Sequence, residues 1–146
     1  FTNPREVLQA LESGDENSGP QVLVSDIRMP PHFESEGIDA CKEIRKRHPG
    51  TGIVILSQKC PHLGCRVPEC ATSQWFECQC HGSQYNRVGE KKGGPAPRGM
   101  DHHPATFAPN GDVTIDTGTK IPGAPVGVNT TGQEAEGPHC TSGGSH

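Results

Sequence analysis

Two short segments of this 146-residue chain contain closely spaced cysteine and histidine residues, side chains that bind many transition metals in proteins. Residues 60–65 read CPHLGC, and residues 78–85 read CQCHGSQY. Each segment holds a proline or a glycine of the kind that tight turns require, so both are expected to be loops. The candidate metal ligands, one cysteine and one histidine from each loop, are Cys60, His62, Cys78 and His81.

These four residues supply two thiolates and two imidazoles. Their distribution over the two loops indicates which kind of metal centre they can form. Zinc accepts such a set, but its structural sites typically combine a closely spaced cysteine pair with a closely spaced histidine pair. Here each loop mixes the two residue types. This favours an iron–sulfur centre in which the thiolates hold one iron and the imidazoles hold the other. Neutral imidazoles make such a centre less negative and place its potential at about −150 to +300 mV.

The chain before these loops is expected to alternate helices and strands. Asn3-Pro4 can cap and start a helix that Gly14 ends, and a short apolar strand follows and ends at Asp26. A second helix is expected at 37–47, where apolar residues share one stripe. The continuous apolar run at 53–56 is typical of a strand buried on both faces. The order helix-strand-helix-strand indicates a parallel α/β unit.

From Lys59 onward the helical period disappears, and turns and short apolar runs predict a mainly β region. Strands are expected at 75–77, just before the second loop, and at 112–116, after the Asn110-Gly111 turn. A polar tail rich in small residues begins at Thr130 and is expected to be flexible. The predicted fold class is therefore mixed, with a partial α/β segment at 1–58, a mainly β iron–sulfur domain at 59–129 and a tail at 130–146.

The overall composition limits the classes of partner. A formal net charge of −4 disfavours a nucleic-acid partner. No apolar run approaches the length of about 20 residues that spans a bilayer. Seven cysteines are an odd number, so at least one is unpaired or serves a metal. Phe1 opens directly on the expected first helix without a signal peptide, which we interpret as the start of a fragment.

Residues 58–119 resemble the Rieske iron–sulfur protein of the cytochrome bc complexes. The two loop sequences and the later Gly-Pro-Ala-Pro at 94–97 have counterparts in that family. The resemblance assigns the four candidate ligands to a [2Fe–2S] cluster and implies a disulfide between Cys65 and Cys80. Rieske oxygenases and their ferredoxins usually lack these two extra cysteines, so the quinol-oxidising branch is favoured. The residues that the family uses to donate hydrogen bonds to sulfur, and so to raise the potential, are Ser83 and Tyr85.

This resemblance implies an electron carrier rather than an enzyme that acts alone. His81 would meet a quinol through its exposed ring nitrogen. The electron would pass to a c-type cytochrome within a membrane complex that also contains a cytochrome b. The implied docking surface consists of Leu63, Gly94, Pro95, Ala96 and Pro97. Cys70 and the segment 136–140 resemble actinobacterial sequences, and the sequence leaves open whether Cys70 and Cys140 form a second disulfide or remain two thiols.

Residues 22–31, VLVSDIRMPP, resemble the phosphoacceptor strand of response-regulator receiver domains, and segments up to Ser57 continue the pattern. This second resemblance makes Asp26 the candidate phosphoacceptor and Ser57 the switch hydroxyl. A receiver also needs an acidic pair that holds Mg²⁺, and that pair belongs to a strand that would precede Phe1. We therefore expect residues 1–58 not to act as a phosphorylation switch.

Two alternatives to the electron carrier follow from this mixed organisation. One is a signalling fragment with a metal-binding tail, and the other is a chimera without function, whose incomplete β fold holds no cluster. The compartment depends on the same choice. Quinol-oxidising Rieske domains lie on the extracytoplasmic side of their membrane, whereas receiver domains are cytoplasmic, and no targeting segment decides between them.

Overall fold

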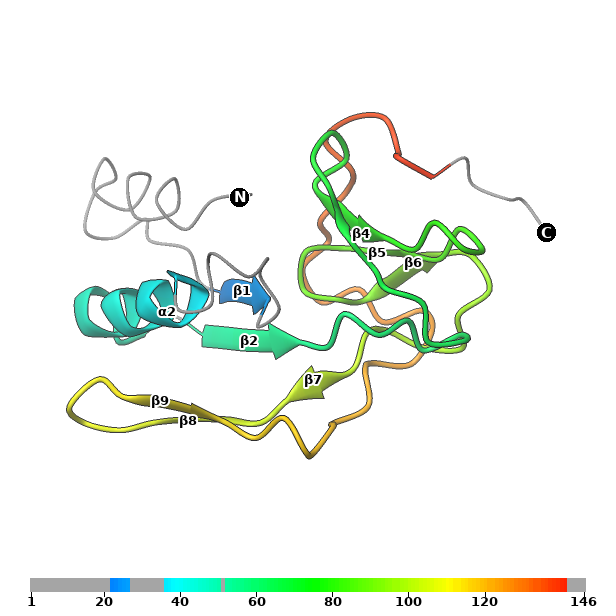
Figure 1. The fold of residues 1–146 in the computed structure, drawn as a ribbon. Coiled ribbons are helices and arrows are strands. Elements are labelled where there is room, and N and C mark those ends of the chain that lie inside the picture. The colour runs from blue at the N-terminus through cyan, green and yellow to red at the C-terminus, as the bar shows by residue number, and fades with distance from the viewer. Residues whose placement is uncertain (1–21, 27–35, 51, 142–146) are drawn as a thin grey trace. The chain divides into compact units, whose positions relative to one another are not determined.

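The structure is a computed structural model that describes residues 22–26, 36–50 and 52–141 (Figure 1). The chain forms two compact units, each made of two stretches of sequence. The first comprises Phe1–Ile55 and His103–Thr119, and the second comprises Leu56–His102 and Lys120–His146. The stretch 103–119 thus lies within the sequence range predicted for the iron–sulfur domain but belongs to the first unit.

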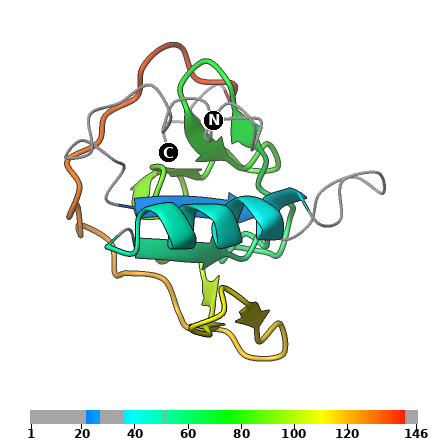
Figure 2. The same cartoon turned by 90° about the vertical axis from the view of Figure 1, so that its left-hand side faces the viewer.

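The strand, helix and strand predicted near the N-terminus are present as β1 (Val22–Asp26), α2 (Glu36–Arg47) and β2 (Gly52–Leu56). α2 packs against β1, and Figures 1 and 2 show the helix lying along the two strands, whose arrows point in the same direction. Parallel neighbours require such a crossover helix between them. Cys41 and Ile44, three residues apart on the helix, are buried, as the apolar stripe predicts. The predicted first helix lies outside the described residues.

A β-hairpin also belongs to the first unit. β8 (Ala105–Phe107) pairs antiparallel with β9 (Val113–Ile115), and the turn between them contains Gly111 with a φ of 90°. β9 confirms the strand predicted at this turn, whereas β8, which has the same length, was not predicted. β7 (His102–His103) is the third strand of the sheet with order β1-β2-β7, and one of its residues belongs to each unit.

The second unit is mainly β, as predicted, and contains a four-stranded antiparallel sheet. In sheet order its strands are β3 (Glu69–Cys70), β4 (Trp75–Glu77), β5 (Gln84–Tyr85) and β6 (Lys91–Gly93). β4 confirms the strand predicted before the second loop. Residues 57–141 contain no α-helix in the structure. Val67, Tyr85 and Met100 are among the buried side chains of this unit.

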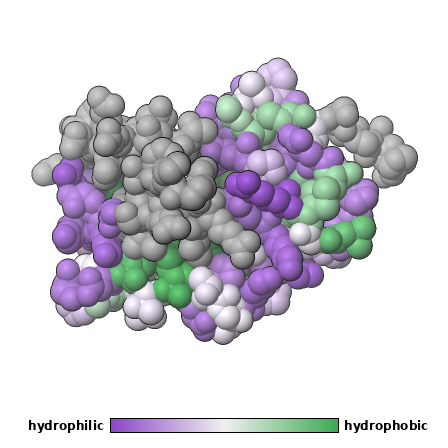
Figure 3. All heavy atoms as spheres, in the orientation of Figure 1, coloured by the Kyte–Doolittle hydropathy of each residue, from purple (hydrophilic) through white to green (hydrophobic). Residues whose placement is uncertain are grey.

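The apolar core is small, as the hydrophobic content of 30% predicts. On the face drawn in Figure 3, hydrophilic side chains cover most of the described surface and apolar colour is confined to separate areas. The exposed large apolar side chains of the described part of the chain are Leu63, Ile121 and Val126. Within that same part, no helix has the length and apolar character that crossing a bilayer requires.

The structure describes residues 130–141 of the tail predicted at 130–146, and the flexibility of this tail stays a prediction. Residues 130–141, here called the strap, are attached to the second unit by a disulfide between Cys70 and Cys140. The backbone N–H of Glu136 in the strap donates to the carbonyl of Ser73 at 3.0 Å. Composition does not reveal this attachment, because the partner cysteine is 70 residues away in the sequence.

An ion pair between Arg98 and Asp101 joins two residues of the segment that follows β6. The guanidinium of Arg98 donates from Nε and Nη2 to the two carboxylate oxygens of Asp101, at 2.9 and 3.0 Å. The N–H of Gly123 donates to the same carboxylate at 3.1 Å. Burial alone raises the pKa of Asp101, but the hydrogen bonds from Arg98 and Gly123 outweigh burial and hold the pKa below its usual value. The charged form of Asp101 therefore stabilises the fold.

Replacing Asp101 by Asn should lower the free energy of unfolding by about 1–3 kcal/mol at neutral pH, because hydrogen bonds to a charged group are lost. Since the folded-state pKa is depressed, the stabilisation is complete above the unfolded-state pKa of about 3.9 and disappears as the pH falls through the folded-state value. Urea unfolding of wild type and D101N at neutral and acidic pH measures this difference. The exposed Asp39 gives the control D39N, and a D101N defect that stays undiminished at low pH would contradict the prediction.

Candidate metal centre

The first cysteine–histidine loop is closed by two backbone hydrogen bonds. The N–H of Gly64 donates to the carbonyl of Cys60 at 2.9 Å, and the N–H of Cys60 donates to the carbonyl of Cys65 at 2.8 Å. Gly64 has a φ of 81°, a conformation that residues with a Cβ rarely adopt. A β-bridge between Lys59 and Arg66 pairs the two ends of the loop. These contacts fix Cys60 at the start of a tight turn.

The second loop repeats this backbone pattern. The N–H of Gly82 donates to the carbonyl of Cys78 at 2.9 Å, and the N–H of Cys78 donates to the carbonyl of Ser83 at 2.8 Å. Gly82 has a φ of 77°. The loop leaves β4 and enters β5, so an antiparallel strand pair holds its two ends side by side. In both loops the candidate cysteine stands first, and a glycine with positive φ stands four residues later.

The two candidate ligand cysteines are buried thiols. Cys60 and Cys78 are 4% and 1% exposed, and neither belongs to a disulfide. The sulfur of Cys60 lies 3.2 Å from the phenol oxygen of Tyr85. Burial raises the pKa of the Cys78 thiol, and the neighbouring Cys60 raises it further. A metal cation at the site would oppose this effect, because it stabilises the thiolate form of both cysteines.

The two candidate imidazoles lie next to each other. The ring centroids of His62 and His81 are 4.9 Å apart, and the rings are perpendicular. His81 is exposed, whereas the Nδ1 atom of His62 is buried and has no hydrogen-bond partner among the described residues. An unpaired buried polar atom costs about 1–3 kcal/mol, and a metal at Nδ1 would pair it. Two buried thiols and two adjacent imidazoles therefore fit a [2Fe–2S] cluster.

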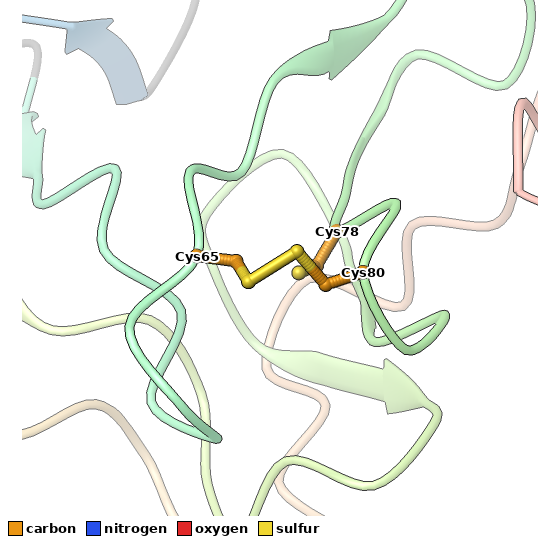
Figure 4. A group of neighbouring side chains, drawn as sticks. All are labelled: Cys65, Cys78 and Cys80. Atoms are coloured by element: carbon orange, nitrogen blue, oxygen red, sulfur yellow. A yellow bond between two sulfur atoms is a disulfide. The ribbon is translucent and has the colours of Figure 1, made fainter.

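A disulfide between Cys65 and Cys80 joins the two loops (Figure 4), and this is the pairing that the family resemblance implies. The two Cα atoms are 6.6 Å apart. The sulfur of Cys78 lies within 4.8 Å of both disulfide sulfurs. Because a cysteine binds metal as a thiolate, the two bridged sulfurs are not available as ligands. The disulfide instead ties one candidate ligand loop to the other.

The two residues implied as hydrogen-bond donors to sulfur, Ser83 and Tyr85, are both fully buried. Burial raises the pKa of the Tyr85 phenol, so the phenol keeps its proton and can donate it to the sulfur of Cys60. The hydroxyl of Ser83 accepts a hydrogen bond from the N–H of Ala96 at 3.2 Å. A hydroxyl that accepts in this way keeps its own proton for a second acceptor.

The Gly-Pro-Ala-Pro segment at 94–97 packs directly onto the second loop. Gly94 has a φ of 78°, and a Cβ at this position would lie 2.5 Å from the carbonyl oxygen of Gly82. Only glycine permits both this backbone conformation and this close approach. The hydrogen bond from Ala96 to Ser83 is a second contact between the same two segments.

The predicted docking surface is exposed except at one position. Its exposed members are Leu63, Gly94, Pro95 and Pro97. Leu63 is 70% exposed, which is unusual for a large apolar side chain. Ala96 requires a correction, because it is only 1% exposed and its side chain is not available to a partner. The contact of its backbone with Ser83 turns this residue inward.

The structure describes only part of the predicted phosphoacceptor region. Asp26 is the last residue of β1, but its side chain lies outside the described part of the structure. Ser57 follows β2 and is buried, and its N–H donates to the carbonyl of Asp101 at 2.7 Å. The receiver assignment therefore stays a prediction.

Sequence reasoning missed a buried carboxylate beside the second loop. Glu77 is the last residue of β4, directly precedes Cys78 and is 1% exposed. It accepts hydrogen bonds from the side chains of Ser73 and His139 and from both the N–H and the hydroxyl of Thr141. Burial alone raises the pKa of Glu77, but these hydrogen bonds outweigh burial and lower it. One feature of the sequence could have indicated that Glu77 is buried. Side chains alternate between the two faces of a strand, so Glu77 of β4 lies on the same face as the buried Trp75.

Comparison with known proteins finds sequence relatives for part of the chain. The iron–sulfur subunit of the chloroplast cytochrome b6-f complex of Chlamydomonas reinhardtii is 45% identical over 65 residues, which are 44% of this chain and 32% of that protein. The corresponding subunit of Microcystis aeruginosa is 44% identical over 65 residues, 44% of this chain and 36% of that protein. The chain thus spans about a third of the length of these relatives.

A solved structure of the plasma membrane Rieske protein PetC3 from Synechocystis PCC 6803 matches 42% of this chain and 62% of that chain, at 26% identity and a TM-score of 0.36. The family assignment rests on sequence. The profile of the Rieske [2Fe-2S] domain matches residues 41–115, a range that contains both cysteine–histidine loops and just over half of the chain. The chain therefore belongs to the Rieske [2Fe–2S] domain family, whose cofactor is a [2Fe–2S] cluster.

Proposed function

We propose that this chain is a one-electron carrier that accepts electrons from a quinol and passes them to a c-type cytochrome. The observation that carries this proposal is a pair of adjacent imidazoles, one of them exposed, in a site with two buried thiols. When bound, a [2Fe–2S] cluster with this ligand set supplies reversible one-electron transfer at a higher potential than all-cysteine ferredoxins. The relatives named as iron–sulfur subunits of cytochrome b6-f complexes support the same role.

In the proposed site, Cys60 and Cys78 hold one iron, and His62 and His81 hold the other. The exposed ring of His81 is the group that a quinol can reach, and its outer nitrogen can hydrogen-bond the quinol and take up a proton. Leu63, which follows His62 in the first loop and is 70% exposed, offers an apolar contact for the quinol ring. Gly94, Pro95 and Pro97 complete the proposed docking surface.

The proposed partners are the cytochrome b and c-type cytochrome subunits of a membrane complex, on the extracytoplasmic side of the membrane. The relatives are named as subunits of cytochrome complexes, which supports these partners. The structure also contains two disulfides, which persist mainly in oxidising compartments.

Iron and acid-labile sulfide analysis tests the proposal directly. Chain purified or reconstituted without oxygen should contain about two irons and two sulfides per chain. Its reduced form should give an EPR signal, because one added electron leaves the coupled pair of irons with an odd number of electrons. Metal analysis and EPR of the same sample provide the measurement. A colourless protein that retains stoichiometric zinc would rule out the electron carrier. It would instead favour a zinc site or a signalling fragment as the function of the chain.

Replacing Tyr85 by Phe should lower the midpoint potential by about 40 mV, the one-electron equivalent of about 1 kcal/mol for a lost hydrogen bond to sulfur. The phenol favours the reduced, more negative state of the site, so the shift has a negative sign. Redox titration followed by EPR or circular dichroism measures it. The exposed Thr114 in β9 gives the control T114V, and equal potentials for Y85F and wild type would remove Tyr85 from the proposed role.

We also propose that residues 1–58 are a receiver-like segment that is not phosphorylated at Asp26. The order β1-α2-β2, with Asp26 at the end of β1, supports the resemblance. Incubation with acetyl phosphate and Mg²⁺ should therefore leave Asp26 unlabelled, since one carboxylate holds a hard cation poorly. Intact-mass analysis gives the readout, and stoichiometric phosphorylation of Asp26 would overturn the expectation and favour a signalling role.

A further inference from the structure

The strap contacts the side chain that immediately precedes the second loop. The Oε1 atom of Glu77 accepts hydrogen bonds from the Ser73 hydroxyl at 2.6 Å and from His139 Nδ1 at 2.7 Å. Its Oε2 atom accepts hydrogen bonds from the N–H of Thr141 at 2.8 Å and from the Thr141 hydroxyl at 3.0 Å. Three of these four donors belong to the strap, which approaches from more than 60 residues away in the sequence.

These contacts exclude a metal-binding role for the same group of residues. The sulfurs of Cys70 and Cys140 and a carboxylate oxygen of Glu77 lie within 4.8 Å of one another. The two sulfurs are joined in a disulfide, with a bond length of 2.06 Å, and are not thiolates. Four donors also occupy the carboxylate, whose lone pairs can accept about four hydrogen bonds. The group is therefore built to fix Glu77 rather than to bind an ion.

The strap is held in place by contacts with the chain between β3 and β4. Besides the disulfide, the hydroxyl of Thr72 donates to the carbonyl of Pro138 at 2.6 Å. A Cβ at Gly137 would lie 2.7 Å from the carbonyl oxygen of Thr72, so the two backbones approach more closely than any other residue type allows. The disulfide thus fixes one end of a segment that already fits its neighbour along several residues.

We propose that Glu77 is a positioning residue for Cys78, and that the strap, latched by the Cys70–Cys140 disulfide, holds Glu77 in place. This inference rests on the proposed role of Cys78 as an iron ligand. Glu77 and Cys78 are consecutive, and the N–H of Glu77 is itself fixed by the carbonyl of Pro68 at 2.9 Å. If the strap is released, the buried carboxylate keeps only its hydrogen bond from Ser73. The end of β4 then rearranges toward water, because a buried charge without enough donors is costly, and the Cys78 thiolate moves with it.

Cluster retention and EPR line shape test this inference in the full chain. The double variant C70S/C140S removes the latch but leaves the Cys65–Cys80 disulfide intact. After reconstitution, it should lose iron to a chelator about tenfold faster than wild type, the factor expected when hydrogen bonds to a charged group are lost. Its EPR signal should broaden, because the Cys78 sulfur is no longer confined to one position.

A second variant and a matched control keep the test independent of the disulfide. T141V removes one donor to Glu77 but keeps the latch, and it should show an intermediate rate of iron loss. E134Q removes an exposed strap carboxylate that pairs with Lys92 and not with Glu77 or its donors, and it should behave as wild type. The inference is overturned if C70S/C140S and T141V keep the wild-type rate and line shape, even when their thermal stability falls. A wild-type chain that holds no iron would instead refute the proposed function.

Discussion

Four side chains from two separate loops have to converge on one small volume, and two of them are buried thiols. Burial and the neighbouring thiol both raise the pKa of Cys78, so the site favours neutral thiols over thiolates. Neutral thiols give no strong attraction that could hold the two loops together. The loops are held by other means: backbone hydrogen bonds that close each turn, glycines with positive φ, and the disulfide between Cys65 and Cys80. These contacts hold the two loops without using the side chain of any of the four candidate ligands.

The rest of the second unit supports this arrangement from several directions. The β4–β5 pair joins the two ends of the second loop, and the segment at 94–97 packs against the same loop through Gly94. The ion pair of Arg98 and Asp101 closes that segment. The apolar core is small, and small cores rely more heavily on covalent links. The two disulfides connect segments that short strands alone would hold weakly.

Much of the site could be predicted from the sequence because its residues are close together in the chain. The ligand spacing, the turn glycines and the donors beside His81 all lie within two short stretches, and β1, α2 and β2 have clear apolar patterns. Glu77, Ala96 and the strap were beyond such reasoning. The environment of Glu77 depends on His139 and Thr141, and a local pattern does not show which distant segment returns to a strand. The burial of Ala96 could not be predicted for the same reason, since it depends on how the second loop folds.

The repeated backbone pattern of the two loops has one further consequence. Counted from the first cysteine, the histidine is two residues along in the first loop and three in the second, while the glycine is four along in both. Two identical loops would give a site with equivalent sides. The two loops differ by this shift of one residue, and the two imidazoles differ in exposure: His81 is exposed and His62 is half-buried. A molecule that approaches from solvent therefore meets more of the ring of His81 than of the ring of His62.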